Sequence, residues 1–496
     1  MSKSVESFAH SPLPADPPER NAAMKTIAHA LAAAAIALLV TGCNVGPNYK
    51  RPASMTPQDY RGTLAPEISD ATAKPTLADQ QWSSIFQDQI LQQLVQEALR
   101  NNLDLRIAAQ RVLEAQAQVG VTRSQQFPSV SGGGSYSALQ IPSALANTNS
   151  NGTPGASFFN GGGPIASAAW NLDFWGLYRR QTEAARADLL STEWAQRATR
   201  SAIVEGVAQA YFELRSLDAQ LEITSNTIKA RNDSLKLVTS LEKYGAGSLA
   251  DTRQAEELLH AAQANLPEIR RRIAVQENTI SILLGHNPNG IDRGLPVDRQ
   301  PHPPEVPVGV PSQLLERRPD IQQAEAKLIA ANARIGVAKA QFFPNISLTS
   351  LGGAASSQLQ SFSGKNTYWY AAASLSEPIF DGGKIRSNYH LSMAQQQEML
   401  LEYKKTILNA LKEVSNALVS YKETREYREE KAAQVTAAAD AVRLARARFS
   451  GGNTSYLEVL TTDTDLYDAQ LALAQAQESE ASSLVELYAA LGGGWQ

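Results

Sequence analysis

The strings VGVTRSQQFPSVS at residues 119–131 and IGVAKAQFFPNIS at residues 335–347 decide the fold of this chain. When their Phe-Pro pairs are aligned, Asp104 coincides with Asp320 and Gly120 with Gly336. Both copies continue through short extended segments, a long stretch without proline, a glycine turn and a final helical segment. A repeat of this length predicts a duplicated structural unit.

Each copy contains one stretch that is free to form a very long helix. Residues 177–243 contain no proline and one glycine, and residues 384–450 contain neither. Because proline costs a helix interior about 3 kcal/mol and glycine about 1 kcal/mol, both stretches predict uninterrupted helices. Apolar residues spaced by four and three predict knobs-into-holes packing. Glycine turns at 245–248 and 450–454 predict that each helix folds back antiparallel.

Polar residues interrupt the apolar stripe of each long helix. They are Thr224 and Arg231 in the first copy, and Arg425 and Arg428 in the second. These positions predict a helix face that contacts water or a second partner. An ordinary dimeric coiled coil is the alternative, but the glycine turns argue against it.

Extended segments are predicted where the helices stop, near residues 127–137, 165–175, 343–352 and 368–380. Their length of about 9–11 residues suits tilted strands of a membrane barrel, and aromatic residues crowd their ends. The polar stretches 137–163 and 352–367 predict exposed outer loops. Four strands cannot close a barrel alone, and open edges are not tolerated in a membrane, so one chain is insufficient. A small soluble sheet is the alternative.

The N-terminal residues 1–42 indicate an export signal. Lys25 precedes an apolar run that is too short to span a membrane, and Gly42-Cys43 follows it. Cys43 is the only cysteine, and we expect it to be acylated after cleavage. A generic signal peptide with an incidental cysteine is the alternative. The proline-rich residues 1–23 fit poorly before such a signal, so translation is expected to begin at Met24.

The remaining organisation follows from these features. We expect a lipidated extended leader, a first repeat, a proline-rich linker and a second repeat, at residues 43–80, 81–290, 291–311 and 312–496.

The composition argues against several functions. The net charge is −4 with acids and bases interspersed, so no nucleic-acid-binding surface is expected. The six histidines are scattered without metal-ligand spacing. No phosphate-binding loop or nucleophile cluster occurs. The sequence therefore predicts no enzyme, no metal and no cofactor beyond the covalent lipid on Cys43.

Three motifs carry a resemblance to a known family. They are Gly42-Cys43 with Val45–Pro52, the helix start Arg317–Ile321 leading to Phe343-Pro344, and Ala490–Trp495. With the duplication, they cover nearly all of the chain after Cys43. The chain resembles the outer-membrane factors, the TolC-like exit ducts, in the lipoprotein branch typified by OprM and NodT.

The resemblance implies an α+β membrane protein. Members form homotrimers in which each protomer gives four strands to one outer-membrane β-barrel, continued by a long periplasmic α-helical barrel. A periplasmic adaptor, or membrane fusion protein, docks on the helix tips, and an inner-membrane pump, expected to be of the RND type, loads the duct. The expected function is passive efflux of drugs or other toxic compounds, as in multidrug resistance, from a protein held in the Gram-negative outer membrane by its barrel and a palmitate-type lipid.

The resemblance also implies two groups of functional residues. Adaptor docking is expected at the helix tips, at Gly245, Gly247, Ser248, Gly451, Gly452 and Thr454. A periplasmic gate is expected at Leu457, Thr461, Asp463 and Asp465. Relatives place an acidic residue where this chain has Thr461, so either aspartate could supply the ring; a solvated acidic helix start is the alternative.

A second class of function also fits part of the sequence. Long hairpins and a lipid anchor suit a periplasmic coiled-coil spacer lipoprotein. The four strands bounded by aromatic residues and the Trp495 motif argue against it.

Overall fold

The computed structural model of the protein describes residues 44–53, 56–57, 60, 77–141, 157–300, 311–356 and 366–495. The predictions for the signal at 1–42, the start at Met24 and lipidation of Cys43 fall outside these residues. The chain divides into two compact units, each assembled from both repeats. The first comprises Met1–Asn48, Gly120–Glu183 and Asn332–Met393, and the second Tyr49–Val119, Ala184–Ala331 and Ala394–Gln496.

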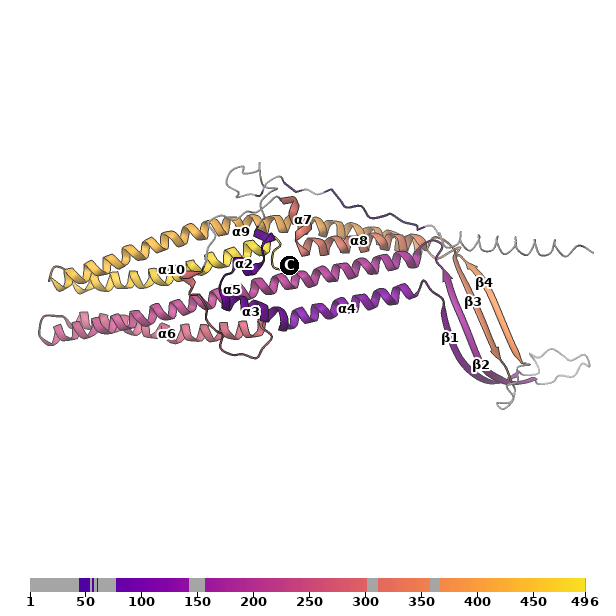
Figure 1. Ribbon diagram of the computed structural model, residues 1–496, viewed down its shortest axis with the longest axis horizontal. Helices are drawn as coiled ribbons and strands as arrows, with labels where there is room; N and C mark the ends of the chain where they lie inside the picture. Colours follow the sequence, from indigo (N-terminus) through magenta and orange to yellow (C-terminus); the bar gives the residue numbers. More distant parts are fainter. Residues whose placement is uncertain are drawn as a thin grey trace, which may run out of the picture. The chain divides into compact units, whose positions relative to one another are not determined.

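The long helices have the predicted bounds. Helices α5 (Leu177–Lys243) and α9 (Lys384–Ser450) contain 67 residues each. At 1.5 Å per residue, each is roughly 100 Å long. Each turns back through glycine into a 35-residue helix, α6 (Leu249–Leu283) or α10 (Tyr456–Ala490), which confirms the antiparallel hairpins (Figure 1).

Shorter helices complete both repeats. Helices α4 (Leu103–Ser124) and α8 (Pro319–Ala340) are equivalent and contain 22 residues each. Pro319 stands at the first position of α8, where its missing N–H has no cost. The other elements are α2 (Trp82–Ile85), α3 (Gln89–Asn101), α7 (Leu314–Arg317) and the 3₁₀ turns η1 (Leu77–Asp79), η2 (Val297–Arg299) and η3 (Pro311–Gln313).

A large apolar core holds the second unit together. Its buried members come from both repeats and include Leu91, Val207, Ile280, Val414 and Leu487. The buried Asp88 caps α3 and accepts hydrogen bonds from the Tyr211 hydroxyl at 2.8 Å and the Leu295 N–H at 2.7 Å. This carboxylate fixes the segment after α6 to the core.

The first unit contains a four-stranded antiparallel sheet. Its order is β1 (Ser129–Ile141), β2 (Ser157–Leu172), β3 (Asn345–Ala354) and β4 (Thr367–Ser376), as Figure 1 shows. The two repeats meet in the β2–β3 pair, where Leu172 faces Ile346. Among the described residues, β1 and β4 are the edge strands.

The described residues contain the four predicted strands, but the predicted strand ends differ from those observed. Strands β1 and β2 contain 13 and 16 residues, so the loop predicted at 137–163 is too long. Ser137 pairs with Gly161, because ladder hydrogen bonds come from the backbone and small polar side chains do not prevent them. Strand β4 ends at Ser376 rather than near 380, and Phe174 and Trp175 follow β2 in a turn.

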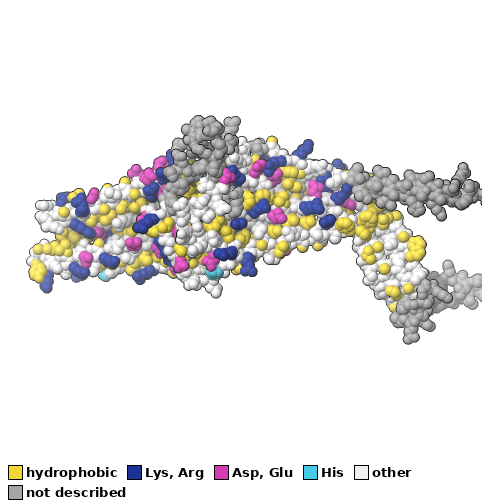
Figure 2. All heavy atoms as spheres, viewed as in Figure 1, with side chains coloured by type: hydrophobic (Ala, Val, Ile, Leu, Met, Phe, Trp, Pro, Cys, Tyr) yellow, Lys and Arg dark blue, Asp and Glu magenta, His cyan; other side chains and the backbone are white. Residues whose placement is uncertain are grey.

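The sheet differs from the helices in its charge. None of its four strands contains Asp, Glu, Lys or Arg. Figure 2 shows the sheet in yellow and white, while both charge signs cover the helices. In the part of the chain that the structure describes, no helix is long and apolar enough to cross a membrane.

Candidate functional site at the hairpin tips

The first tip, residues 244–248, is a tight turn at the end of the α5–α6 hairpin. Gly245 adopts a φ of +73°, which favours glycine. The Ser248 side chain caps α6 in a reciprocal capping box with Asp251. Tyr244 is 80% exposed and projects an apolar ring from this tip.

The second tip, residues 451–455, has the same turn with a different surface. Gly452 adopts a φ of +71°, and the Asn453 N–H donates to the Arg448 carbonyl at 2.9 Å. Phe449, in the last turn of α9, packs against Tyr456 with ring centroids 5.2 Å apart. The tip predictions therefore fall on two glycine turns, and only the first displays an exposed aromatic ring.

The structure separates the predicted gate residues onto two faces of α10. Leu457, Thr461 and Asp465 follow one another at intervals of four, so they share one face, and all three are exposed in the protomer. Asp463 lies on another face, with 13% of its side chain exposed.

Asp463 binds two arginines instead of lining an open face. One is Arg231 of α5, whose Nε lies 2.9 Å from Asp463 Oδ2. The other is Arg446 of α9, whose Nη2 lies 3.1 Å from Asp463 Oδ1. The sequence leaves open whether Asp463 or Asp465 forms the acidic ring, and in the protomer the charge of Asp463 is already paired between helices.

Arg231 is the centre of a contact network between the hairpins. It is 6% exposed, donates to the Leu258 carbonyl of α6 at 2.9 Å, and lies over the Tyr467 ring at 5.2 Å. The Tyr467 hydroxyl contacts Thr224 Oγ1 at 3.0 Å. Thr224 and Arg231, which interrupt the apolar stripe of α5, therefore contact α10. Of the two predicted environments, water or a second partner, these residues have the second.

The network is closely packed. Val238, Ala255 and Ala445 form a small apolar core with Tyr456, Val459 and Leu460. The cavity beneath Arg231 and Asp463 has a volume of about 10 Å³, which leaves room for about one water molecule. Burial raises the pKa of Tyr456, and the Asp463 carboxylate adds to this rise. This region is suited to holding two hairpins together and not to binding a substrate.

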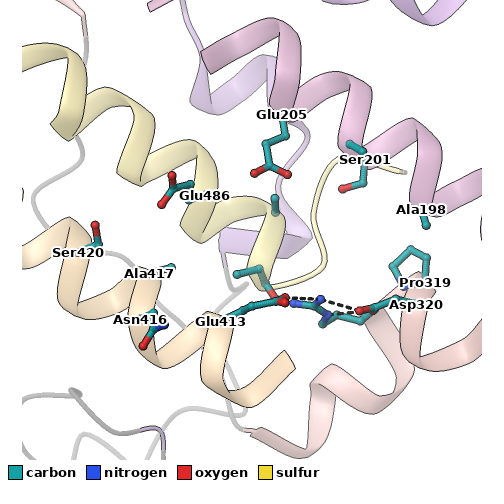
Figure 3. A pocket seen from close by; sticks show the side chains of 14 residues that line it. Ala198, Ser201, Glu205, Pro319, Asp320, Glu413, Asn416, Ala417, Ser420 and Glu486 are labelled. Atoms are coloured by element: carbon teal, nitrogen blue, oxygen red, sulfur yellow. Dashed lines mark hydrogen bonds and ion pairs between the residues drawn. The ribbon is translucent and has the colours of Figure 1, made fainter. Parts of the chain in front are cut away.

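A larger cavity of about 480 Å³ lies between α5, α9 and the ends of α8 and α10. Figure 3 shows Glu205 of α5 and Glu486 of α10 on one side, and Glu413 and Asp320 bound to Arg318 on the other. Burial raises the pKa of Glu205, followed by the charges of Glu486 and Glu413. Within the described ranges, no group of three His, Cys, Asp or Glu residues is placed to hold a metal ion.

Long helical hairpins, ion pairs between the hairpins and a charge-free sheet agree with the outer-membrane duct expected from the sequence. The family of proteins described as outer membrane efflux protein matches residues 94–286 and 310–493. The chain belongs to this family, and it is an outer-membrane component of an efflux system.

Similar proteins cover almost its full length. A probable efflux pump outer membrane protein, TtgC of Pseudomonas putida, is 36% identical over 94% of this chain and 95% of its own. The cation efflux system protein CusC of Escherichia coli is 33% identical over 93% of this chain and 98% of its own. A crystal structure of CusC superimposes with a TM-score of 0.81 at 30% identity, and it covers 91% of this chain and 100% of the other. Family membership removes the spacer alternative.

Proposed function

We propose that this outer-membrane efflux protein works as a homotrimer in which each protomer gives four strands to one shared β-barrel. The observation that carries this proposal is the charge-free sheet with β1 and β4 as its edges in the described chain. Unpaired strand edges are costly in hydrocarbon, where water cannot satisfy their N–H and C=O groups. Pairing β1 of one protomer with β4 of the next satisfies both edges.

The long helices then continue the duct as an α-helical barrel in the periplasm. A periplasmic adaptor binds the two tips and an inner-membrane pump of the RND type supplies the energy. The duct itself performs no chemistry and conducts small molecules passively. The relatives are described as acting in efflux of antibiotics, toluene and cations. We assign drugs or other toxic compounds to this chain, with selection made by the pump.

Gating is assigned to α10. Leu457, Thr461 and Asp465 line the pore at the closed end, where three aspartates related by symmetry repel one another and attract cations. Asp463 acts differently, because its pairs with Arg231 and Arg446 hold α10 against α5 and α9. Opening requires these pairs to separate. Asp465→Ala should reduce the cation preference of single-channel currents, whereas an unchanged preference would remove Asp465 from the ring.

Lipid on Cys43 provides a second attachment to the outer membrane. This assignment rests on the Gly42-Cys43 motif of the sequence. Within the first unit, the Val45 carbonyl and Asn48 Oδ1 that follow Cys43 accept hydrogen bonds from Arg180. The adaptor contacts Gly245, Gly247 and Ser248 at the first tip, and Gly451, Gly452 and Thr454 at the second.

Native mass spectrometry of the protein extracted from outer membranes tests the proposal. A trimer whose chains begin at Cys43 and carry the mass of added acyl chains is the expected result. A monomer or dimer would contradict the shared barrel, because the edges of β1 and β4 would have no partners.

A further inference from the structure

The first unit contains a charged side chain that neither the duct nor the gate explains. Arg180, in the first turn of α5, is 1% exposed. Three of its hydrogen bonds go to the N-terminal leader: to the carbonyls of Val45 at 3.2 Å and Gly46 at 3.3 Å, and to Asn48 Oδ1 at 2.9 Å. The fourth partner is Glu183 Oε2 at 2.8 Å. Burying a guanidinium is unfavourable unless its donors are satisfied, so the leader stabilises this position.

Two glycines bring the leader into backbone contact with α8. Gly46 adopts a φ of +104°, and a Cβ atom there would lie 2.5 Å from the Cα atom of Gly336. A Cβ atom on Gly336 would lie 2.9 Å from the buried Arg180 side chain. The Asn332 amide donates to the Pro47 carbonyl at 2.9 Å. The leader therefore occupies a fitted groove built from α5 and α8.

The groove lies where the two repeats enter the sheet. Arg180 follows β2 by eight residues, and Gly336 precedes β3 by nine. The Val45 N–H donates to the Trp175 carbonyl at 3.2 Å. Trp175 in turn stacks on Phe343 at 4.6 Å and donates from Nε1 to the Pro344 carbonyl at 3.0 Å. Contacts therefore connect the leader to the segment that follows β2 and to the segment that precedes β3.

We propose that this groove is a docking site for the chain's own residues 44–48, and that docking fixes the helical ends of β2 and β3 in register. The two strands belong to different repeats, so a long connection separates them in the sequence and closing it is entropically unfavourable. The docked leader bridges α5 and α8 directly and limits that freedom. The leader is then a structural clasp between the repeats, in addition to any lipid that it carries.

The duplication supplies a matched pair of variants. Gly336→Ala forces a Cβ atom onto Arg180. Gly120→Ala changes the equivalent residue of the first repeat, where a Cβ atom meets nothing within 4 Å. Gly46→Ala acts from the leader alone, through its positive φ and its contact with Gly336. All three are made in the full chain and purified in detergent.

Hydrogen–deuterium exchange measured by mass spectrometry provides the test. For Gly336→Ala and Gly46→Ala, we expect exchange at least about tenfold faster in the leader and at the Leu172 and Ile346 ends of the strands, because lost contacts allow local opening. Gly120→Ala should match the unmodified protein. Wild-type exchange at the strand ends despite a released leader would overturn the proposal, and so would equal effects of Gly120→Ala and Gly336→Ala.

A milder variant covers the case in which the alanine variants do not assemble. Asn48→Ala removes one acceptor of Arg180 from the exposed leader and leaves the groove unchanged. A few-fold increase in exchange in the leader and at the same strand ends supports the clasp. Unchanged exchange at both places overturns it.

Discussion

The two hairpins have the same dimensions and different surroundings. In each, 67 residues are followed by a glycine turn and 35 residues. When Gly285 is aligned with Gly492, the exposed Pro267 of α6 corresponds to Ala474 of α10. Ala474 is buried, and its carbonyl accepts a hydrogen bond from Ser216 of α5 at 3.0 Å.

The two equivalent helices α6 and α10 therefore differ in how much of their surface packs against other helices. Helix α10 contacts α5, α6 and α9 through Tyr467 and Asp463. Helix α6 leaves much of its length exposed and tolerates an internal proline. The length of a hairpin is therefore a repeated property, whereas the role of each hairpin depends on what surrounds it.

The largest effect is expected when proline and alanine are exchanged at the equivalent positions 267 of α6 and 474 of α10. Ala474→Pro should destabilise the protein by about 3 kcal/mol or more, because proline removes a helix hydrogen bond and its ring clashes with the preceding turn. Pro267→Ala should instead stabilise the protein, by up to about 3 kcal/mol, because alanine restores a backbone donor at an exposed position inside α6. Urea denaturation followed by circular dichroism measures both. Changes of equal magnitude in the two variants would mean that the hairpins are packed alike.

The next largest effect is expected at the contact between hairpins. Arg231→Ala removes the pair with Asp463, the bond to Leu258 and the contact with Tyr467, and should cost about 2–3 kcal/mol. We also expect a higher resting conductance in planar bilayers. Lys236→Ala is the control, since its pair with Asp233 is exposed and contributes about 0–1 kcal/mol. A wild-type resting current in Arg231→Ala would show that these contacts do not hold the gate closed.

Substitutions of the aromatic residues at the two hairpin tips should affect different properties, protein stability in one case and adaptor binding in the other. Phe449→Ala loses a packed ring and should cost about 1 kcal/mol. Tyr244→Ala should leave stability unchanged, because its ring is exposed, and should weaken binding of the purified adaptor measured by surface plasmon resonance. If Phe449→Ala weakened adaptor binding more than Tyr244→Ala did, the two tips would have exchanged roles.

The smallest expected effect on stability is that of Glu205, in the cavity between α5 and α9. Burial, followed by Glu486 and Glu413, raises the pKa of Glu205. The folded state therefore holds a proton that the unfolded state releases, and the stability from this group is lost as pH rises through the folded pKa. Glu205→Gln should raise the thermal midpoint slightly near pH 7.5 and have little effect near pH 4.

Glu413 of α9 provides the contrast, because it pairs with Arg318 at 2.7 Å. Glu413→Gln should lower the midpoint near pH 7.5 by removing that partner. If the thermal midpoint near pH 7.5 rose in both Glu205→Gln and Glu413→Gln, the ion pair with Arg318 would not stabilise the protein.

Much of the fold could be predicted because its determinants are local. The absence of proline allowed two very long helices, and the flanking glycines gave the bounds of α5 and α9. Gly245 and Gly452 marked turns that require positive φ. The strands were placed correctly, but their ends were not, because Ser and Gly residues such as Ser137 and Gly161 are compatible with either loop or ladder. The gate residues were predicted within one segment, but the sequence could not decide which of them pack against other helices.

The sequence by itself determined the duplication, the lengths of the hairpins, the existence of four strands and the membership of the family. The structure placed the strand ends so that Asp173 and Glu377 lie outside the sheet. Only the tertiary structure decided that Asp463 is paired, that Gly336 is crowded while Gly120 is open, and that Arg180 holds the leader. The physical reason is separation along the chain. Helix breaking and turn formation depend on neighbouring residues, whereas Arg231 and Asp463 are 232 positions apart and meet only because the folded helices place them together.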